Sequence, residues 1–145
     1  MTVTGWSLVR FVHVLSAMGW VGGQLLLSLV VLPVIRTDLD DAIRAPLVRR
    51  TAKRFGLISN AALLPLLLLS GIALAAHRGV EIAHLGDPGY TRLLSIKLVL
   101  VILSISLAAT HGLLATSRPR LARPLAITGL ATSVGIVVFA TALVP

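Results

Sequence analysis

The sequence lacks cysteine altogether and contains few acidic residues. Its 145 residues include no Cys and only five Asp and Glu, against 13 Lys and Arg. Without cysteine the chain has no disulfide framework, no thiolate metal site and no cysteine nucleophile. All five acidic residues fall in segments that we predict to be loops. A proton relay through carboxylates inside a membrane is therefore not supported.

Charge is scarce overall, and apolar residues are abundant. Charged residues make up 12% of the chain and hydrophobic residues 57%, whereas an ordinary soluble domain carries about 25% charged residues. The composition predicts an all-α fold, a four-helix transmembrane bundle that forms one integral membrane domain over residues 1–145. At about 20 residues per crossing, the predicted spans cover residues 5–33, 56–77, 92–116 and 125–144.

The first predicted span carries a histidine between two tryptophans. Trp6, His13 and Trp20 are seven residues apart, so they fall along one face of a helix. Small residues, including Gly19 and Gly23, flank that face and would let a neighbouring helix approach closely. An ionisable ring inside hydrocarbon usually faces the interior of a bundle and marks a functional site. Pro33 is expected to end this span.

The segments between the spans predict the orientation. We expect residues 36–54 to form short helical pieces at the membrane surface, broken or kinked at Pro46, and residues 78–91 and 117–124 to form loops. The first and third loops hold nine basic residues, and the N-terminal flank and second loop hold three. Basic loops face the cytoplasm, so both termini are predicted to lie on the extracytoplasmic side.

The net charge of +8 is explained by the same basic loops. They suit anionic lipid at the cytoplasmic surface, and the run from Arg49 to Arg54 is expected to be a lipid-facing anchor. The predicted partner is therefore the lipid bilayer and not nucleic acid. The predicted location is a cell membrane, as a multi-pass protein of the bacterial inner membrane.

Heptad spacing also marks inward faces on the second and third spans. Ser70 and His77 are seven residues apart, and so are Lys97, Ser104 and His111. Such seams suit packed helices with these residues turned inward. On the predicted orientation His13 and Lys97 lie about 12 and 8 Å below the outer ends of their helices. His111 lies near the cytoplasmic side, too far to share a ligand with His13.

Each polar residue has a functional and a structural interpretation. His13 is either an axial haem ligand or metal ligand, or it is hydrogen-bonded to a helix carbonyl or a serine. Lys97 either serves as a ligand or binds an anion such as a propionate, or it snorkels to the headgroups. His111 is either a ligand at a second site or a hydrogen-bonding residue. Trp20 either flanks a ligand or only packs.

His77 and His84 lie at the outer side of the predicted bundle. The structural interpretation makes both of them solvated interfacial residues. The functional interpretation joins them with His13 as a histidine cluster for copper, since the chain is nearly devoid of soft sulfur ligands.

An ordered set of motifs resembles the copper-resistance-D-like (CopD-like) family of integral membrane proteins and the related HemJ-type protoporphyrinogen oxidases. The motifs are His13-x6-Trp20-Val21-Gly22-Gly23, Pro33, Arg50 to Phe55, Pro65, Ser70-Gly71, Leu94-x2-Lys97-Leu98 and His111. The resemblance covers about residues 6–115. It implies a helical bundle in which the first-helix histidine and the third-helix lysine are tied to haem b binding and activity. Carried over, these roles fall on His13 and Lys97.

Three functions follow as expectations. The first is a haem b-binding redox or carrier protein with His13 as axial ligand, with HemJ-like porphyrinogen oxidation as one form of it. The second is a copper-binding or copper-transport protein that uses His13, His77 and His84. The third is a structural membrane subunit without a ligand, in which the Gly19-x3-Gly23 spacing serves a homodimer. A membrane redox partner is a further expectation of the first.

Overall fold

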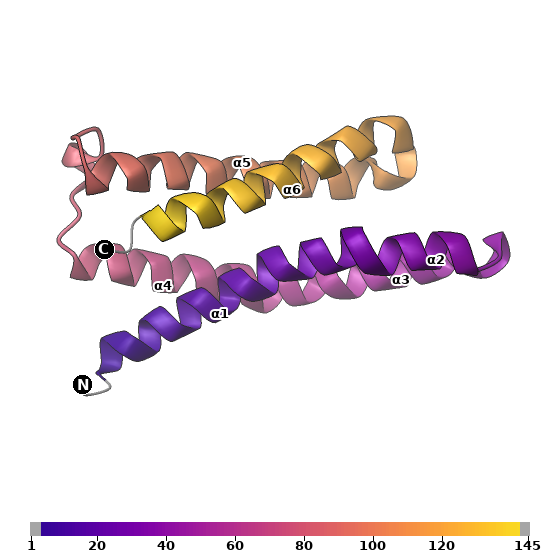
Figure 1. The fold of residues 1–145 in the computed structure, drawn as a ribbon, viewed down its shortest axis with the longest axis horizontal. Helices are drawn as coiled ribbons and strands as arrows, with labels where there is room; N and C mark the ends of the chain where they lie inside the picture. The colour runs from indigo at the N-terminus through magenta and orange to yellow at the C-terminus, as the bar shows by residue number, and fades with distance from the viewer. Residues whose placement is uncertain (1–3, 143–145) are drawn as a thin grey trace. The chain divides into compact units, whose positions relative to one another are not determined.

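The computed structural model describes residues 4–142, with the side chains of residues 82, 116 and 119 excepted. This part of the chain is almost entirely helical and contains no β-strand (Figure 1). The elements in chain order are α1 (Gly5–Leu26), the π-helical turn η1 (Leu27–Val31), α2 (Leu32–Asp38), α3 (Asp41–Ile58), the π-helical turn η2 (Ser59–Leu63), α4 (Leu64–His77), the 3₁₀ turn η3 (Ile82–His84), α5 (Tyr90–Ser117) and α6 (Pro119–Ala142).

The chain divides into two compact units, Met1–Gly79 and Val80–Pro145. Each unit is a helical hairpin: α1–α2 runs back along α3–α4, and α5 runs back along α6 (Figure 1). Four helical runs are long and apolar enough to cross a membrane: Gly5–Asp38, Asp41–His77, Tyr90–Ala115 and Arg120–Ala142. The predictions of an all-α chain and of four membrane-length helices are confirmed, and these helices indicate a multi-pass membrane protein.

Two expectations about the first hairpin are wrong. Pro33 does not end the first helix, which continues to Asp38, and residues 41–54 are not separate surface pieces. The second helical run begins at Asp41 and continues to His77 for 37 residues. Pro46 lies six residues into it and removes one backbone hydrogen bond without ending the helix.

The two π-helical turns explain how the helices pass through their other prolines. Each turn of five residues is followed by Leu and then Pro, as Leu32-Pro33 and Leu64-Pro65. The N–H of Leu64 reaches back five residues to the carbonyl of Ser59, and the N–H of Leu32 does the same to Leu27. The wider turn places the proline ring where no regular i−4 hydrogen bond is required. The helix therefore continues instead of stopping.

Glycine and aromatic residues bring the helices of the first hairpin together. A Cβ on Gly23 would lie 2.4 Å from Cε2 of Phe55, and a Cβ on Gly19 would lie 3.0 Å from Cδ2 of Leu63. The Phe55 ring stacks in turn on the buried Trp20, with ring centroids 6.4 Å apart. The Gly19-x3-Gly23 spacing is thus used for packing within the chain.

The second hairpin turns more tightly than expected. Only Arg118 separates α5 from α6, so most of the predicted loop at residues 117–124 is helical. Between the helices, Ser104 and Ser133 are fully buried, and their hydroxyls lie 2.8 Å apart. Ser133 donates its proton to the carbonyl of Gly129, so Ser104 is the donor in that pair. Residues 143 and 144 of the fourth predicted span lie outside the described residues.

Candidate functional site

His13 points across the first hairpin at α4. Its Nδ1 lies 3.1 Å from the carbonyl oxygen of Leu67 and 3.0 Å from Oγ of Ser70. A carbonyl can only accept, so Nδ1 carries the proton. The Ser70 hydroxyl donates to the carbonyl of Leu66 and can accept from His13. In its neutral form the imidazole is then the Nδ1–H tautomer, with its lone pair on Nε2.

Gly71 makes this arrangement sterically feasible. A Cβ at Gly71 would lie 3.0 Å from Cε1 of His13 and 3.5 Å from its Nδ1. The half-buried imidazole thus approaches α4 with its Nδ1–Cε1 edge where a glycine leaves room for it. The hydrogen-bonding interpretation of His13 predicted a helix carbonyl or a serine as partner, and both are present. Gly71 has no polar atom in its side chain, and only its place beside Ser70 could have suggested the contact.

Trp6 and His77 close the open end of the first hairpin. Their rings stack with centroids 3.8 Å apart and an interplanar angle of 12°. Trp6 belongs to the first turn of α1 and His77 is the last residue of α4. Heptad spacing placed both residues on inward seams, but it did not predict that they meet. His77 therefore has an aromatic partner instead of being only a solvated residue.

Trp20 lies further along α1 in the same hairpin. It is seven residues from His13, which is about 10 Å along the helix. The residue is buried and packs on Phe55. This contact agrees with the packing interpretation of Trp20.

Lys97 and His111 both belong to α5 in the second hairpin. The Lys97 side chain is half-buried and makes no hydrogen bond or ion pair with residues 4–142. His111 donates its Nδ1–H to the carbonyl of Ala122 on α6, at 2.8 Å. The two residues are 14 positions apart, about 21 Å along the helix. They therefore cannot hold the same small ligand.

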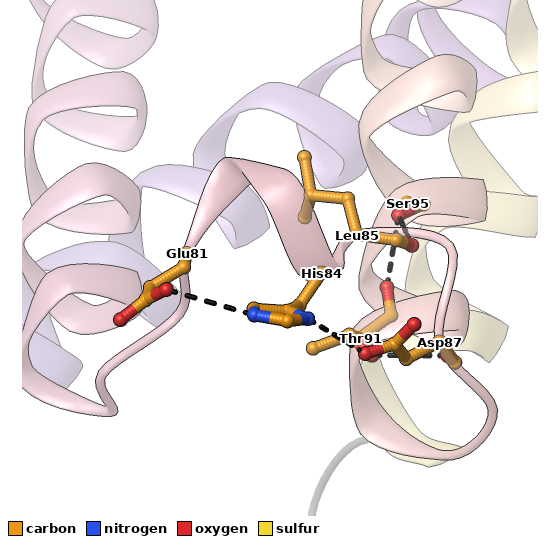
Figure 2. Close-up of polar contacts among 6 residues, drawn as sticks. All are labelled: Glu81, His84, Leu85, Asp87, Thr91 and Ser95. Carbon is orange, nitrogen blue, oxygen red and sulfur yellow. Dashed lines mark hydrogen bonds and ion pairs between the residues drawn. The ribbon is translucent and has the colours of Figure 1, made fainter.

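His84 lies in the segment that precedes α5, between two carboxylates (Figure 2). Its Nδ1 is 2.9 Å from Oδ2 of Asp87 and its Nε2 is 3.7 Å from Oε2 of Glu81. The side chain is 61% exposed. This geometry is that of a solvated residue with acidic neighbours.

Hydrogen bonds from side chains of α5 to backbone carbonyls hold the same segment onto this helix. The Ser95 hydroxyl donates to the carbonyl of Leu85, and Thr91 Oγ1 donates to the carbonyl of Asp87 at 3.0 Å (Figure 2). Both hydroxyls come from the first two turns of α5. The segment is therefore a folded cap on this helix.

The histidines proposed as copper ligands have separate partners. Within the first hairpin, His13 contacts Leu67 and Ser70, whereas His77 stacks on Trp6 seven residues away along α1. Among the residues that the structure describes, no three His, Asp or Glu side chains gather closely enough to hold a metal ion. The first hairpin therefore presents His13 as a single oriented imidazole.

Comparison of the chain with protein-family models, with curated proteins and with solved structures finds no match. The resemblance to CopD-like and HemJ-type proteins thus stays a prediction from the motifs.

Proposed function

We propose that the chain is a multi-pass protein of the cell membrane, of the bacterial inner-membrane type, that binds haem b through His13. The hydrogen bond from His13 Nδ1–H to α4 carries the proposal. Histidines that ligate a metal almost always donate their other ring N–H to an oxygen, which fixes the ring and puts the lone pair on the ligating nitrogen. Leu67 and Ser70 supply those oxygens here.

The residues around His13 fit an axial ligand. A neutral Nδ1–H imidazole is the form that ligates iron through Nε2. Gly71 leaves room for the ring beside α4, and the hydrogen bonds to Leu67 and Ser70 fix its orientation. Bound haem would supply one-electron chemistry, while the chain would hold the ring and exclude water. The resemblance ties Lys97 to haem b binding as well.

The orientation of the helices follows from the basic residues. The hairpin end around residues 36–54 and the turn at Arg118 carry most of the positive charge, so the proposal places them in the cytoplasm. His13, eight residues into α1, is then about 12 Å below the extracytoplasmic end of its helix. The proposed haem lies in the outer half of the bilayer and could exchange electrons with a redox partner there.

An absorption spectrum of the detergent-purified protein, oxidised and then reduced with dithionite, tests this function. We expect a Soret band, either as purified or after addition of haem, that is lost in His13→Ala. The exposed His84→Ala variant is the matched control and should keep the band. Ser70→Ala should keep the band but change the midpoint potential, because it removes one oxygen that accepts from the axial histidine.

Two outcomes would overturn the proposal. One is a folded protein that never acquires a Soret band on reconstitution with haem. The other is copper, found by metal analysis in a porphyrin-free preparation and lost in His13→Ala. The second outcome would replace haem with copper at the same histidine.

A further inference from the structure

The longest helical run carries a cluster of cations between its polar and apolar parts. The run Asp41–His77 has 37 residues and is about 55 Å long, whereas the hydrocarbon core of a bilayer is about 30 Å thick. One end must therefore project from the core. That end is the charged one, because every residue from Phe55 to Ala76 is uncharged and four cations precede it: Arg49, Arg50, Lys53 and Arg54.

These four cations, the basic arc, all face the same way. At about 100° per residue, they cover about 140° of the helix circumference. Phe55 falls on the opposite side, where its ring meets the Gly23 position on α1. The basic arc therefore faces away from the partner helix of the hairpin. All four side chains are exposed.

No acidic residue neutralises the basic arc. Within the described chain none of its four members forms an ion pair. Arg44 differs, because it contacts Asp41 at 2.7 Å and donates to the carbonyl of Leu39. Three of the arc cations, with Ala45 and Pro46, line a shallow groove of about 420 Å³. The groove therefore offers positive charge without a carboxylate.

The surface changes from charged to apolar directly beyond the groove. Leu57 points in the same direction as the centre of the basic arc, one turn further along the helix. It is 68% exposed, and the neighbouring Ile58 is 56% exposed. A ligand that fits both parts has an anionic head and an apolar tail.

We propose that the basic arc and Leu57 form a binding site for one anionic phospholipid. Its phosphate lies in the groove among Arg49, Arg50 and Lys53, and an acyl chain lies along Leu57. Guanidinium and ammonium groups are the usual protein partners of phosphate, and a basic segment next to a membrane helix attracts anionic lipid. The site is independent of any ligand at His13.

The test measures how much phosphatidylglycerol remains with the full-length protein during purification from mixed phosphatidylglycerol–phosphatidylcholine vesicles. The variant Arg49→Gln/Arg50→Gln/Lys53→Gln should lower retention about tenfold or more, with phosphatidylcholine unchanged. The matched control, Arg118→Gln/Arg120→Gln/Arg123→Gln, removes three charges from the other basic turn and should lower it by less than about twofold.

A second comparison separates a lipid from a free anion. Leu57→Ser keeps every charge and should still reduce phosphatidylglycerol retention, because the acyl contact is lost. Added glycerol phosphate or inorganic phosphate should not displace the lipid at equal concentration. Equal losses in the two triple variants would mean that general charge attraction is responsible, and efficient displacement by phosphate would mean a site for free anions. Either result overturns the proposal.

Discussion

The helices of the two hairpins are held together by different kinds of contact. In the first, the two helical runs Gly5–Asp38 and Asp41–His77 fit by shape, with glycines against Leu63, Phe55 and His13. In the second, polar bonds connect α5 and α6, through the Ser104–Ser133 pair and the His111–Ala122 bond. Lipid provides no hydrophobic drive for helices to associate, so close packing and hydrogen bonds are the remaining means. Each hairpin relies mainly on one of them.

Length separates the hairpins as well. The helical runs of the first, with 34 and 37 residues, are about 51 and 55 Å long. Those of the second, with 28 and 24 residues, are about 42 and 36 Å long. Only the first therefore exceeds the bilayer core by a large margin, and it does so with a charged end. The hairpin that fits by shape also carries the proposed lipid site.

One feature is common to both hairpins. Each has a histidine that donates Nδ1–H to a backbone carbonyl of the facing helix, His13 to Leu67 and His111 to Ala122. Their positions differ, since His13 lies within the span and His111 lies close to the turn at Arg118. The same bond can thus orient a ligand in one place and close a turn in the other.

The largest effect is expected where the helices of the first hairpin pack most closely. Gly23→Ala should lower the free energy of unfolding by about 1–2 kcal/mol, because the new methyl group collides with the Phe55 ring. The ring cannot retreat easily since it stacks on the buried Trp20. Unfolding in mixed micelles of mild detergent and dodecyl sulfate measures the change.

Gly22→Ala is the control for that substitution. Apart from the neighbouring residues of its own helix, none of the described residues has an atom within 4 Å of a Cβ built there. The variant should therefore be neutral or stabilised by up to about 1 kcal/mol through helix propensity. Phe55→Leu should restore part of the loss in Gly23→Ala. Equal effects at both glycines would show that shape is not what pairs these helices.

A smaller effect is expected at the turn of the second hairpin. His111→Ala should cost about 1 kcal/mol, because the buried Ala122 carbonyl loses its donor. Thr110→Ala is the control, since Thr110 donates only to Ser106 on its own helix. The same unfolding assay applies. A larger loss in Thr110→Ala than in His111→Ala would contradict the role given to the interhelical bond.

The smallest effect is expected for the serine pair. A double-mutant cycle with Ser104→Ala and Ser133→Ala should give a coupling energy of about 0.6 kcal/mol, the average for hydrogen bonds between membrane helices. Each substitution keeps the Cβ and removes only the hydroxyl oxygen, so little packing is lost. A coupling energy near zero would mean that the second hairpin, like the first, is held by shape.

The inward-facing positions of the helices could be predicted from the sequence, but not all of the residues that they contact. Heptad spacing identified six polar inward residues: His13, Ser70, His77, Lys97, Ser104 and His111. Contacts across the hairpins confirm five of them, whereas Lys97 makes no hydrogen bond or ion pair with residues 4–142. The stacking of His77 on Trp6 and the contact of Phe55 with Gly23 were not foreseen. Heptad spacing defines which face of a helix turns inward. Which residues on two such faces meet depends on how far one helix is shifted along the other.

The proline positions were the least predictable part. Pro33 was expected to end a helix and Pro46 to break or kink one, and both lie inside continuous helical runs. Local rules count the hydrogen bond that a proline removes. They do not foresee the π-helical turn that precedes Pro33, or that Pro46 lies within an uninterrupted α-helix.

The sequence by itself determined that this is an all-α chain with four membrane-length helices, because apolar runs and scarce charge depend only on composition and order. Tertiary structure alone decided that His13 donates to Leu67 and Ser70 beside Gly71, and that the basic arc faces away from α1. Those facts depend on the register and rotation of one helix against another, which are fixed by side chains distant in the chain.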